Sequence, residues 1–363
     1  MSDAKPAVIV TGVAGQLGVR LLPFLSAWDV TGLDTYPPVS SVSLRFESLD
    51  LAKEESCMQL TSIIQDLKPV GVVHLASEPN SPGQNVADTD SMWHSMVAGT
   101  ARVMEAITEA NRDVHVVEKF IYQSSALVYG PDISAPVGEE HPLAADDFPF
   151  ALQQVEADQV VKQRAPALRG CSVFMLRPQL LAGPGMHNYL IDAFRGAPQG
   201  DGKRAQRMRD KGERISYALP YGNDYLQKKK QFLHVDDLAR LVAYLLARTE
   251  PESQRLTVLN VSGRGDALTV KQCAQAAHAT LKRVPGKLGM EKLLEYRWNA
   301  GISPVAPEFL PYITGDSLLN TDRLRNFLGD AYEKVIRRTN AEAFSDSFMP
   351  AKPEPVQGSL AEK

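Results

Sequence analysis

The clearest candidate for chemistry is the segment TGVAGQLG, in which Gly12, Gly15 and Gly18 follow an apolar, strand-like run. Glycines at this spacing permit a tight turn, a close approach of the backbone to a pyrophosphate and close packing of the following helix. A second strand-like run ends at Asp34, whose carboxylate can accept hydrogen bonds from a ribose diol; the alternative is a turn residue at the end of a strand. The pattern predicts a dinucleotide site. Because Asp34 would repel a 2′-phosphate and the next two residues bring no cation, NAD is favoured over NADP.

Few other side chains have the setting of a catalytic acid or base. His187 follows GPG in a predicted loop and could face a ligand, although a lone loop histidine more commonly lies at the surface or serves packing, and His141 invites the same interpretation. Asp146 and Asp147 precede the segment FPF, where a helix N-cap is the simpler role and a substitute acid the alternative. Ser125 has no convincing His and Asp partners, so no nucleophilic triad is predicted.

Positive charge gathers in GKRAQRMRDKGER, residues 202 to 214. Arg204, Arg207 and Arg209 could bind an anionic ligand through their planar guanidinium groups. The alternative is a solvated insertion. The segment is too short to indicate a nucleic-acid site.

The elements that must position these residues alternate along the chain. Apolar runs in AVIVTG, WDVTGLD, VGVVHLA, EKFIYQSS and CSVFMLRP predict buried strands, and residues 15–27, 54–67, 88–111 and 150–165 predict helices. This order predicts a doubly wound α/β fold with a parallel sheet. We expect a dinucleotide-binding domain over residues 1–177, which also receives segments near 232–262, and a smaller substrate lobe over 178–345. The polar, proline-rich tail at 350–363 is expected to be disordered.

Composition narrows the class of protein. The chain has 363 residues, 44% hydrophobic and 23% charged, which suits a large core in one domain or in a domain plus a smaller lobe. Its formal net charge of −4 makes nucleic acid and anionic membranes unexpected partners. The 3 cysteines are widely spaced and predict neither a disulfide framework nor a metal site. Without a signal-peptide pattern or an apolar run near about 18 residues, a cytoplasmic location is expected.

Taken in order, these motifs resemble the extended short-chain dehydrogenase/reductase family, which includes nucleotide-sugar epimerases and dehydratases. The similarity runs over about residues 7 to 340 and includes LRPQLLAGPG, FLHVDDLA, NVSGRGDALTVKQ and LNTDRLRNFLG. It implies cofactor contacts at Gly12, Val13, Ala14, Gly15, Gln16, Leu17, Gly18 and Asp34, at Asp50 and Leu51 in LDL, and at Leu75, Ala76 and Ser77 in VVHLAS. It also implies NAD as cofactor, a small anionic or nucleotide-linked ligand in the lobe, and a homodimer as a candidate assembly.

The chain departs from this family at the chemistry. Ser125 in YQSSALVYG matches the serine that orients the reacting oxygen, but Phe150 and Gln154 stand where the family has the proton-transferring Tyr and the Lys that lowers its pKa. Met96 stands where asparagine is common. Losing a positioned acid/base costs roughly 10² to 10⁴ in rate. The resemblance therefore implies an NAD(H)-binding protein with little ordinary redox turnover. The alternatives are an epimerase, dehydratase or reductase with a substitute acid/base, and NAD that is structural or cycles during a redox-neutral reaction.

Overall fold

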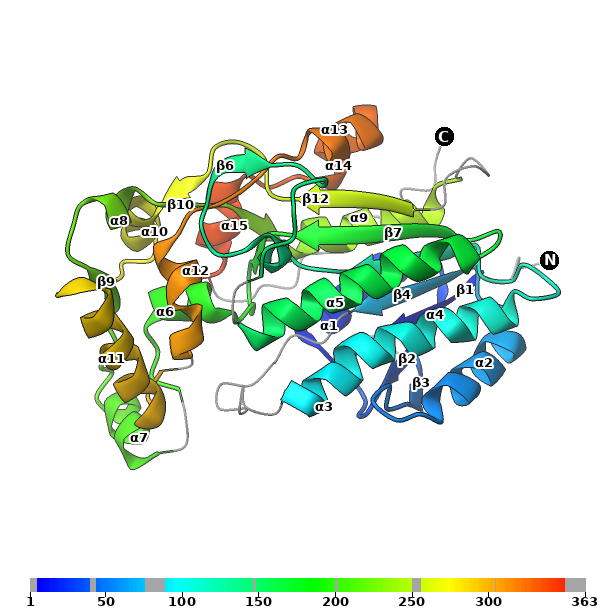
Figure 1. Cartoon of the computed structure of the whole chain (residues 1–363), viewed down its shortest axis with the longest axis horizontal. Coiled ribbons are helices and arrows are strands. Elements are labelled where there is room, and N and C mark those ends of the chain that lie inside the picture. Colours follow the sequence, from blue (N-terminus) through cyan, green and yellow to red (C-terminus); the bar gives the residue numbers. More distant parts are fainter. Residues whose placement is uncertain are drawn as a thin grey trace.

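A parallel sheet of seven strands forms the centre of the protein, in the order β12-β7-β5-β4-β1-β2-β3 (Figure 1). The computed structural model describes residues 5–39, 44–75, 89–145, 148–199, 202–249, 256–303 and 305–349. The strands of this sheet are β1 (Ala7–Thr11), β2 (Asp29–Asp34), β3 (Arg45–Ser48), β4 (Gly71–Leu75), β5 (Lys119–Gln123), β7 (Ser172–Pro178) and β12 (Leu256–Val261). The doubly wound α/β fold predicted from the sequence is confirmed.

Helices cover both faces of the sheet because its strands are apolar on both sides. Val8 and Val10 of β1 pack with α1 and α9, whereas Ile9 between them packs with α2, α4 and α5 on the opposite face. The bounds are α1 (Gln16–Leu21), α2 (Ser56–Leu67), α4 (Gly99–Ala110), α5 (Pro149–Arg164), α9 (Val235–Ala247) and α13 (Asp322–Leu328). Shorter segments are η1 (Leu22–Leu25), α3 (Thr89–Trp93), the π turn η2 (His94–Ala98), η3 (Ala126–Tyr129) and η4 (Ala165–Ala167).

The remaining elements lie beyond the carboxyl ends of the strands, where the arrowheads point in Figure 1. Their strands are β6 (Ile133–Val137), β8 (Leu180–Ala182), β9 (Tyr217–Pro220), β10 (Lys229–Lys230), β11 (Phe232–His234), β13 (Leu268–Thr269), β14 (Leu281–Val284) and β15 (Ser317–Leu319). Their helices are α6 (Tyr189–Arg195), α7 (Lys203–Asp210), α8 (Asp224–Gln227), α10 (Val270–Ala276), α11 (Gly286–Asn299), α12 (Leu310–Thr314), α14 (Tyr332–Val335) and α15 (Asn340–Asp346), with η5 (Pro307–Phe309) and η6 (Gly329–Ala331). An aromatic and aliphatic core of their own holds these elements together.

The five predicted strands correspond to β1, β2, β4, β5 and β7, and the four predicted helices correspond to α1 with η1, α2, the α3–α4 segment, and α5. β12 joins the edge of the sheet beside β7, with Leu256 opposite Val173. Within the described ranges, no helix is long and apolar enough to cross a bilayer.

Candidate cofactor and ligand site

The glycine loop between β1 and α1 is held in a shape that only glycine tolerates at two positions. Gly12 has φ +70°, and a Cβ there would lie 2.8 Å from the carbonyl oxygen of Leu75. A Cβ on Gly18 would lie 2.5 Å from the carbonyl oxygens of both Gly12 and Val13. The helix is therefore seated directly on the loop, and its first turn opens where a pyrophosphate would be bound by backbone N–H groups. The loop residues fit the dinucleotide predicted from the sequence.

The other residues of this loop divide between packing and polar contact. Val13 and Leu17 are buried in the core under the sheet, so only their backbone atoms could contact a cofactor. Asp34, at the carboxyl end of β2, accepts hydrogen bonds from the backbone N of Ala14 at 2.9 Å and of Thr35 at 2.8 Å. Because each carboxylate oxygen has more than one lone pair, Asp34 can hold the loop and still accept from a ribose.

Asp50 and Leu51 follow β3 along the same edge of the sheet. Asp50 Oδ1 accepts from the backbone N of Ala52 at 3.0 Å, and the carbonyl of Leu51 accepts from Arg102 Nη1 at 2.8 Å. Leu75 ends β4 against Gly12. Ala76 and Ser77, like Asp146 and Asp147, lie outside the described residues.

His74 links three elements behind the loop and was not singled out from the sequence. Thr100 donates its hydroxyl proton to the carbonyl of Met96 at 2.6 Å, so its oxygen accepts from His74 Nε2 at 3.0 Å. This leaves His74 Nδ1 to accept from the Thr11 hydroxyl at 2.6 Å. Burial lowers the pKa of His74 to about 4, because the imidazolium would be desolvated. His74 is therefore a neutral tie between β1, β4 and α4.

This burial predicts that the protein loses stability as the pH falls from 7 to 5. The unfolded chain binds a proton near pH 6.5, whereas folded His74 does so only near its pKa of about 4, so falling pH favours the unfolded state within that window. The effect of one such histidine is about 2 kcal/mol at pH 5. Urea unfolding at pH 7 and pH 5 would measure it. The His74→Gln variant should lose about 2 kcal/mol less than the wild type on acidification; equal losses would contradict the assignment. His234, with a pKa of about 4 from burial, retains its share in both proteins.

Phe150 lies in an apolar cluster at the start of α5. It is buried together with Met96 of η2 and Phe148, whose ring centroid is 6.1 Å from that of Phe150. Phe148 in turn packs against Phe309 at 4.6 Å and Tyr312 at 5.7 Å, from the far end of the chain. Aromatic side chains of the smaller lobe thus enclose the place where the resemblance assigns proton transfer.

Ser125 lies at the end of β5, where it caps η3. Its Oγ accepts from the backbone N of Leu127 at 3.2 Å. Both η2 and η3 pack against α5. The structure thus brings together the elements that carry Ser125, Met96 and Phe150.

Gln154, one turn after Phe150, is only 1% exposed and faces the sheet. Its Nε2 donates to the hydroxyl of Tyr122 at 2.5 Å. Burial, with the nearby Asp158, holds the pKa of Tyr122 well above 10. An enclosed phenol that gives up its proton so reluctantly is a poor substitute for the missing tyrosine.

A buried ion pair continues this polar line. Arg177 Nε donates to Asp158 Oδ2 at 2.9 Å, and neither side chain is exposed to solvent. Arg177 also donates to the hydroxyl of Tyr129 at 2.7 Å, which donates to Asn260 at 2.7 Å. An arginine within the apolar run CSVFMLRP was the sequence signal for a buried pair, because a charge there needs a partner. Tyr129 is therefore engaged in the interior.

His187 lies across from the glycine loop. Its backbone N donates to Gln16 Oε1 at 2.7 Å, and Gln16 Nε2 donates to its carbonyl at 3.3 Å. The ring Nδ1 is 2.9 Å from Asp192 Oδ1, which also accepts from Arg195 at 3.1 Å. The imidazole is half exposed, at 52%, and is oriented by a carboxylate that is 4% exposed. Asp192 was missed from the sequence because it lies five residues further along, on α6, beyond the predicted loop.

The structure does not bring the three arginines of the basic segment to the glycine loop. They lie on α7, at the end of the lobe away from the sheet (Figure 1). Arg204 donates to the hydroxyl of Tyr296 and stacks on its ring, and Arg209 donates to the carbonyl of Pro198 at 3.1 Å. Arg207 is exposed. These contacts favour the solvated-insertion interpretation over an anion clamp at the cofactor.

Residues 8–261 match the family described as NAD dependent epimerase/dehydratase family. The UDP-glucose 4-epimerase of Bacillus subtilis is 26% identical over 251 residues, which are 64% of this chain and 70% of the relative. UDP-glucose 4-epimerase GEPI48 of Cyamopsis tetragonoloba is 25% identical over 303 residues, 78% of this chain and 83% of the relative.

Solved structures share the fold. The UDP-glucose 4-epimerase of Thermus thermophilus, in complex with NAD, has a TM-score of 0.65 at 18% identity and covers 94% of this chain and 97% of its own. MoeE5, in complex with UDP-glucuronic acid and NAD, has a TM-score of 0.64 at 19% identity with the same coverage of both chains.

Proposed function

Because this chain belongs to the NAD dependent epimerase/dehydratase family, we propose that it binds NAD(H) without the Tyr and Lys acid/base pair and carries out little ordinary redox turnover. It would then act as a non-catalytic subunit, a sensor or a partner protein. The observation that carries this proposal is the combination of a glycine loop fitted for a dinucleotide with a phenylalanine and a glutamine at positions 150 and 154.

The cofactor half of the proposal assigns roles to particular residues. The loop from Gly12 to Gly18 would hold the pyrophosphate, and Asp34 would hold the adenosine ribose while it orders the loop through Ala14. Bound NAD supplies a carbon that accepts or returns a hydride. Asp34 would repel the additional phosphate of NADP, and Thr35 and Tyr36 bring no positive charge.

The catalytic half rests on the surroundings of positions 150 and 154. Proton transfer to a substrate oxygen needs a titratable group within hydrogen-bond reach of it. Phe150 has no such group, and its partners Met96 and Phe148 are apolar as well. Gln154 is engaged with Tyr122 and carries no charge that could lower the pKa of a neighbouring phenol. These residues pack as a core would, which supports loss of the shared function of the pair.

The second candidate is an active epimerase, dehydratase or reductase that uses His187 as its acid/base. The observation in its favour is the Asp192 carboxylate, which orients the imidazole beside the glycine loop. A small anionic or nucleotide-linked substrate, such as the UDP-linked sugar acid in MoeE5, would suit the smaller lobe over residues 178–345.

Titration of NADH and NADPH by fluorescence, with turnover assays on UDP-glucose, tests both candidates. We expect NADH to bind at least about tenfold more tightly than NADPH, because one unpaired like-charge contact costs about 1.4 kcal/mol or more. The Asp34→Asn variant should narrow this gap. Equal affinities in the wild type would remove the assigned role of Asp34. Rapid turnover by the wild type that disappears in His187→Ala would favour the second candidate.

A further inference from the structure

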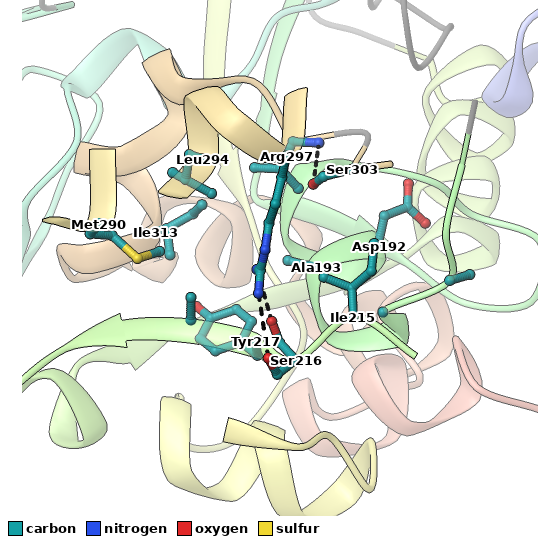
Figure 2. Close-up of a pocket in the computed structure, with 14 residues that line it drawn as sticks. Asp192, Ala193, Ile215, Ser216, Tyr217, Met290, Leu294, Arg297, Ser303 and Ile313 are labelled. Atoms are coloured by element: carbon teal, nitrogen blue, oxygen red, sulfur yellow. Dashed lines mark hydrogen bonds between the residues drawn. The ribbon is translucent and has the colours of Figure 1, made fainter. Parts of the chain in front are cut away.

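A pocket in the smaller lobe contains a buried cation with no counter-ion (Figure 2). The pocket lies between α6, β9 and α11, and its empty space, counted to the mouth, is about 370 Å³. Arg297 of α11 crosses it and is 9% exposed. Its Nη1 donates to the carbonyl of Ser216 at 2.9 Å, and its Nη2 lies 3.4 Å from the Ser216 hydroxyl. These two contacts leave most of the five N–H donors of the guanidinium unused.

No carboxylate among the described residues forms an ion pair with Arg297. Burial lowers the pKa of this guanidinium, and no neighbouring acid opposes that effect. Asp192 lines the pocket, but its carboxylate binds His187 and Arg195 and points away from Arg297 in Figure 2. A buried charge that lacks a partner destabilises a protein by several kcal/mol, so an anion in this pocket would relieve a real cost.

The walls of the pocket indicate what kind of anion would fit. Around the guanidinium they are mainly aliphatic, formed by Ile215, Met290, Leu294, Val305 and Ile313. A phosphate or a sulfate would seek more polar donors than this lining offers. A carboxylate matches the planar fork of an arginine with two oxygens, and an attached apolar chain would bury surface against the aliphatic side chains. The hydroxyl of Ser216 is placed to donate a further hydrogen bond.

We propose that this pocket binds a small organic monocarboxylate with an apolar body, held by Arg297 and Ser216. The site is separate from the glycine loop and does not depend on NAD binding. α6 connects the two: its amino-terminal side begins next to His187, which is bonded to Gln16, and Gly196 after its carboxyl end lines the pocket. Arg297 carries the recognition of charge, and the aliphatic wall carries the recognition of shape.

The test is calorimetric titration of the full chain with 4-methylpentanoate and, separately, with the matched neutral amide 4-methylpentanamide. The acid should bind at least about tenfold more tightly than the amide, since a hydrogen bond to a charged group is worth that much or more. Arg297→Gln should weaken binding of the acid at least about tenfold and leave the amide unchanged. Arg207→Gln, on exposed α7, is the matched control and should bind the acid like the wild type.

Thermal unfolding separates a ligand-binding arginine from a structural one. The acid should raise the melting temperature of the wild type and not that of Arg297→Gln. Free Arg297→Gln should melt no lower than the free wild type, because the substitution removes an unpaired buried charge. Equal binding of acid and amide, no binding of either, or tighter binding of inorganic phosphate than of the acid would each overturn the proposal. A large fall in the melting temperature of free Arg297→Gln would do the same.

Discussion

Gly18→Ala should weaken NAD binding by about 100-fold while leaving the protein folded. The added Cβ would lie 2.5 Å from two backbone carbonyl oxygens, at Gly12 and Val13, and neither can rotate away as a side chain would. Helix α1 must therefore shift off the loop, which costs roughly 2 to 3 kcal/mol and displaces the N–H groups at its first turn. Fluorescence titration with NADH would measure the loss of affinity.

Gly138→Ala provides the matched control for this variant. A Cβ at Gly138 would meet no atom within 4 Å, and its φ lies outside the positive range. This variant should bind NADH like the wild type. Circular dichroism and a melting curve would establish that Gly18→Ala is folded at the temperature of the titration. Undiminished NADH affinity in a folded Gly18→Ala protein would mean that the loop does not hold the pyrophosphate.

The parts of this fold that could be predicted depend on local pattern. β1 and β7 are buried on both faces, so they read as unbroken apolar runs, and α5 begins at a proline in its first turn. β6 and β15 were not predicted. They are five and three residues long, and they pair with each other across almost the whole length of the smaller lobe's sequence. Such a pairing leaves no periodic signal in either segment.

The candidate site divides in the same way. Spacing alone identified Gly12, Gly18 and Asp34, because each position in that loop has a fixed steric or electrostatic role. The roles of His74 and Asp192 depend on partners that other elements supply, namely Thr100 for His74 and His187 for Asp192. Identical residues in another fold would have no such partners.

The reverse experiment on α5 has the second large expected effect. The double variant Phe150→Tyr/Gln154→Lys should gain about 100-fold or more in hydride transfer over the wild type, assayed at 340 nm with NAD and UDP-glucose. Phe150→Tyr alone should gain little, because its phenol would keep a pKa near 10 or above in this apolar cluster. An ammonium at position 154 would lie near the buried Asp158, one turn further along α5, which would help to compensate its charge.

The matched control moves the ammonium by one residue. Gln153 neighbours Gln154, but its amide donates to the carbonyl of Thr89 at 2.7 Å, away from Tyr122. The variant Phe150→Tyr/Gln153→Lys therefore adds the same two groups without placing them on one helix face. Ultraviolet titration of the introduced phenol gives a readout that needs no substrate: its pKa should fall only in the double variant with position 154 changed. If both double variants titrate alike, or if the wild type already turns over UDP-glucose rapidly, the residues at 150 and 154 do not explain the chemistry of this protein.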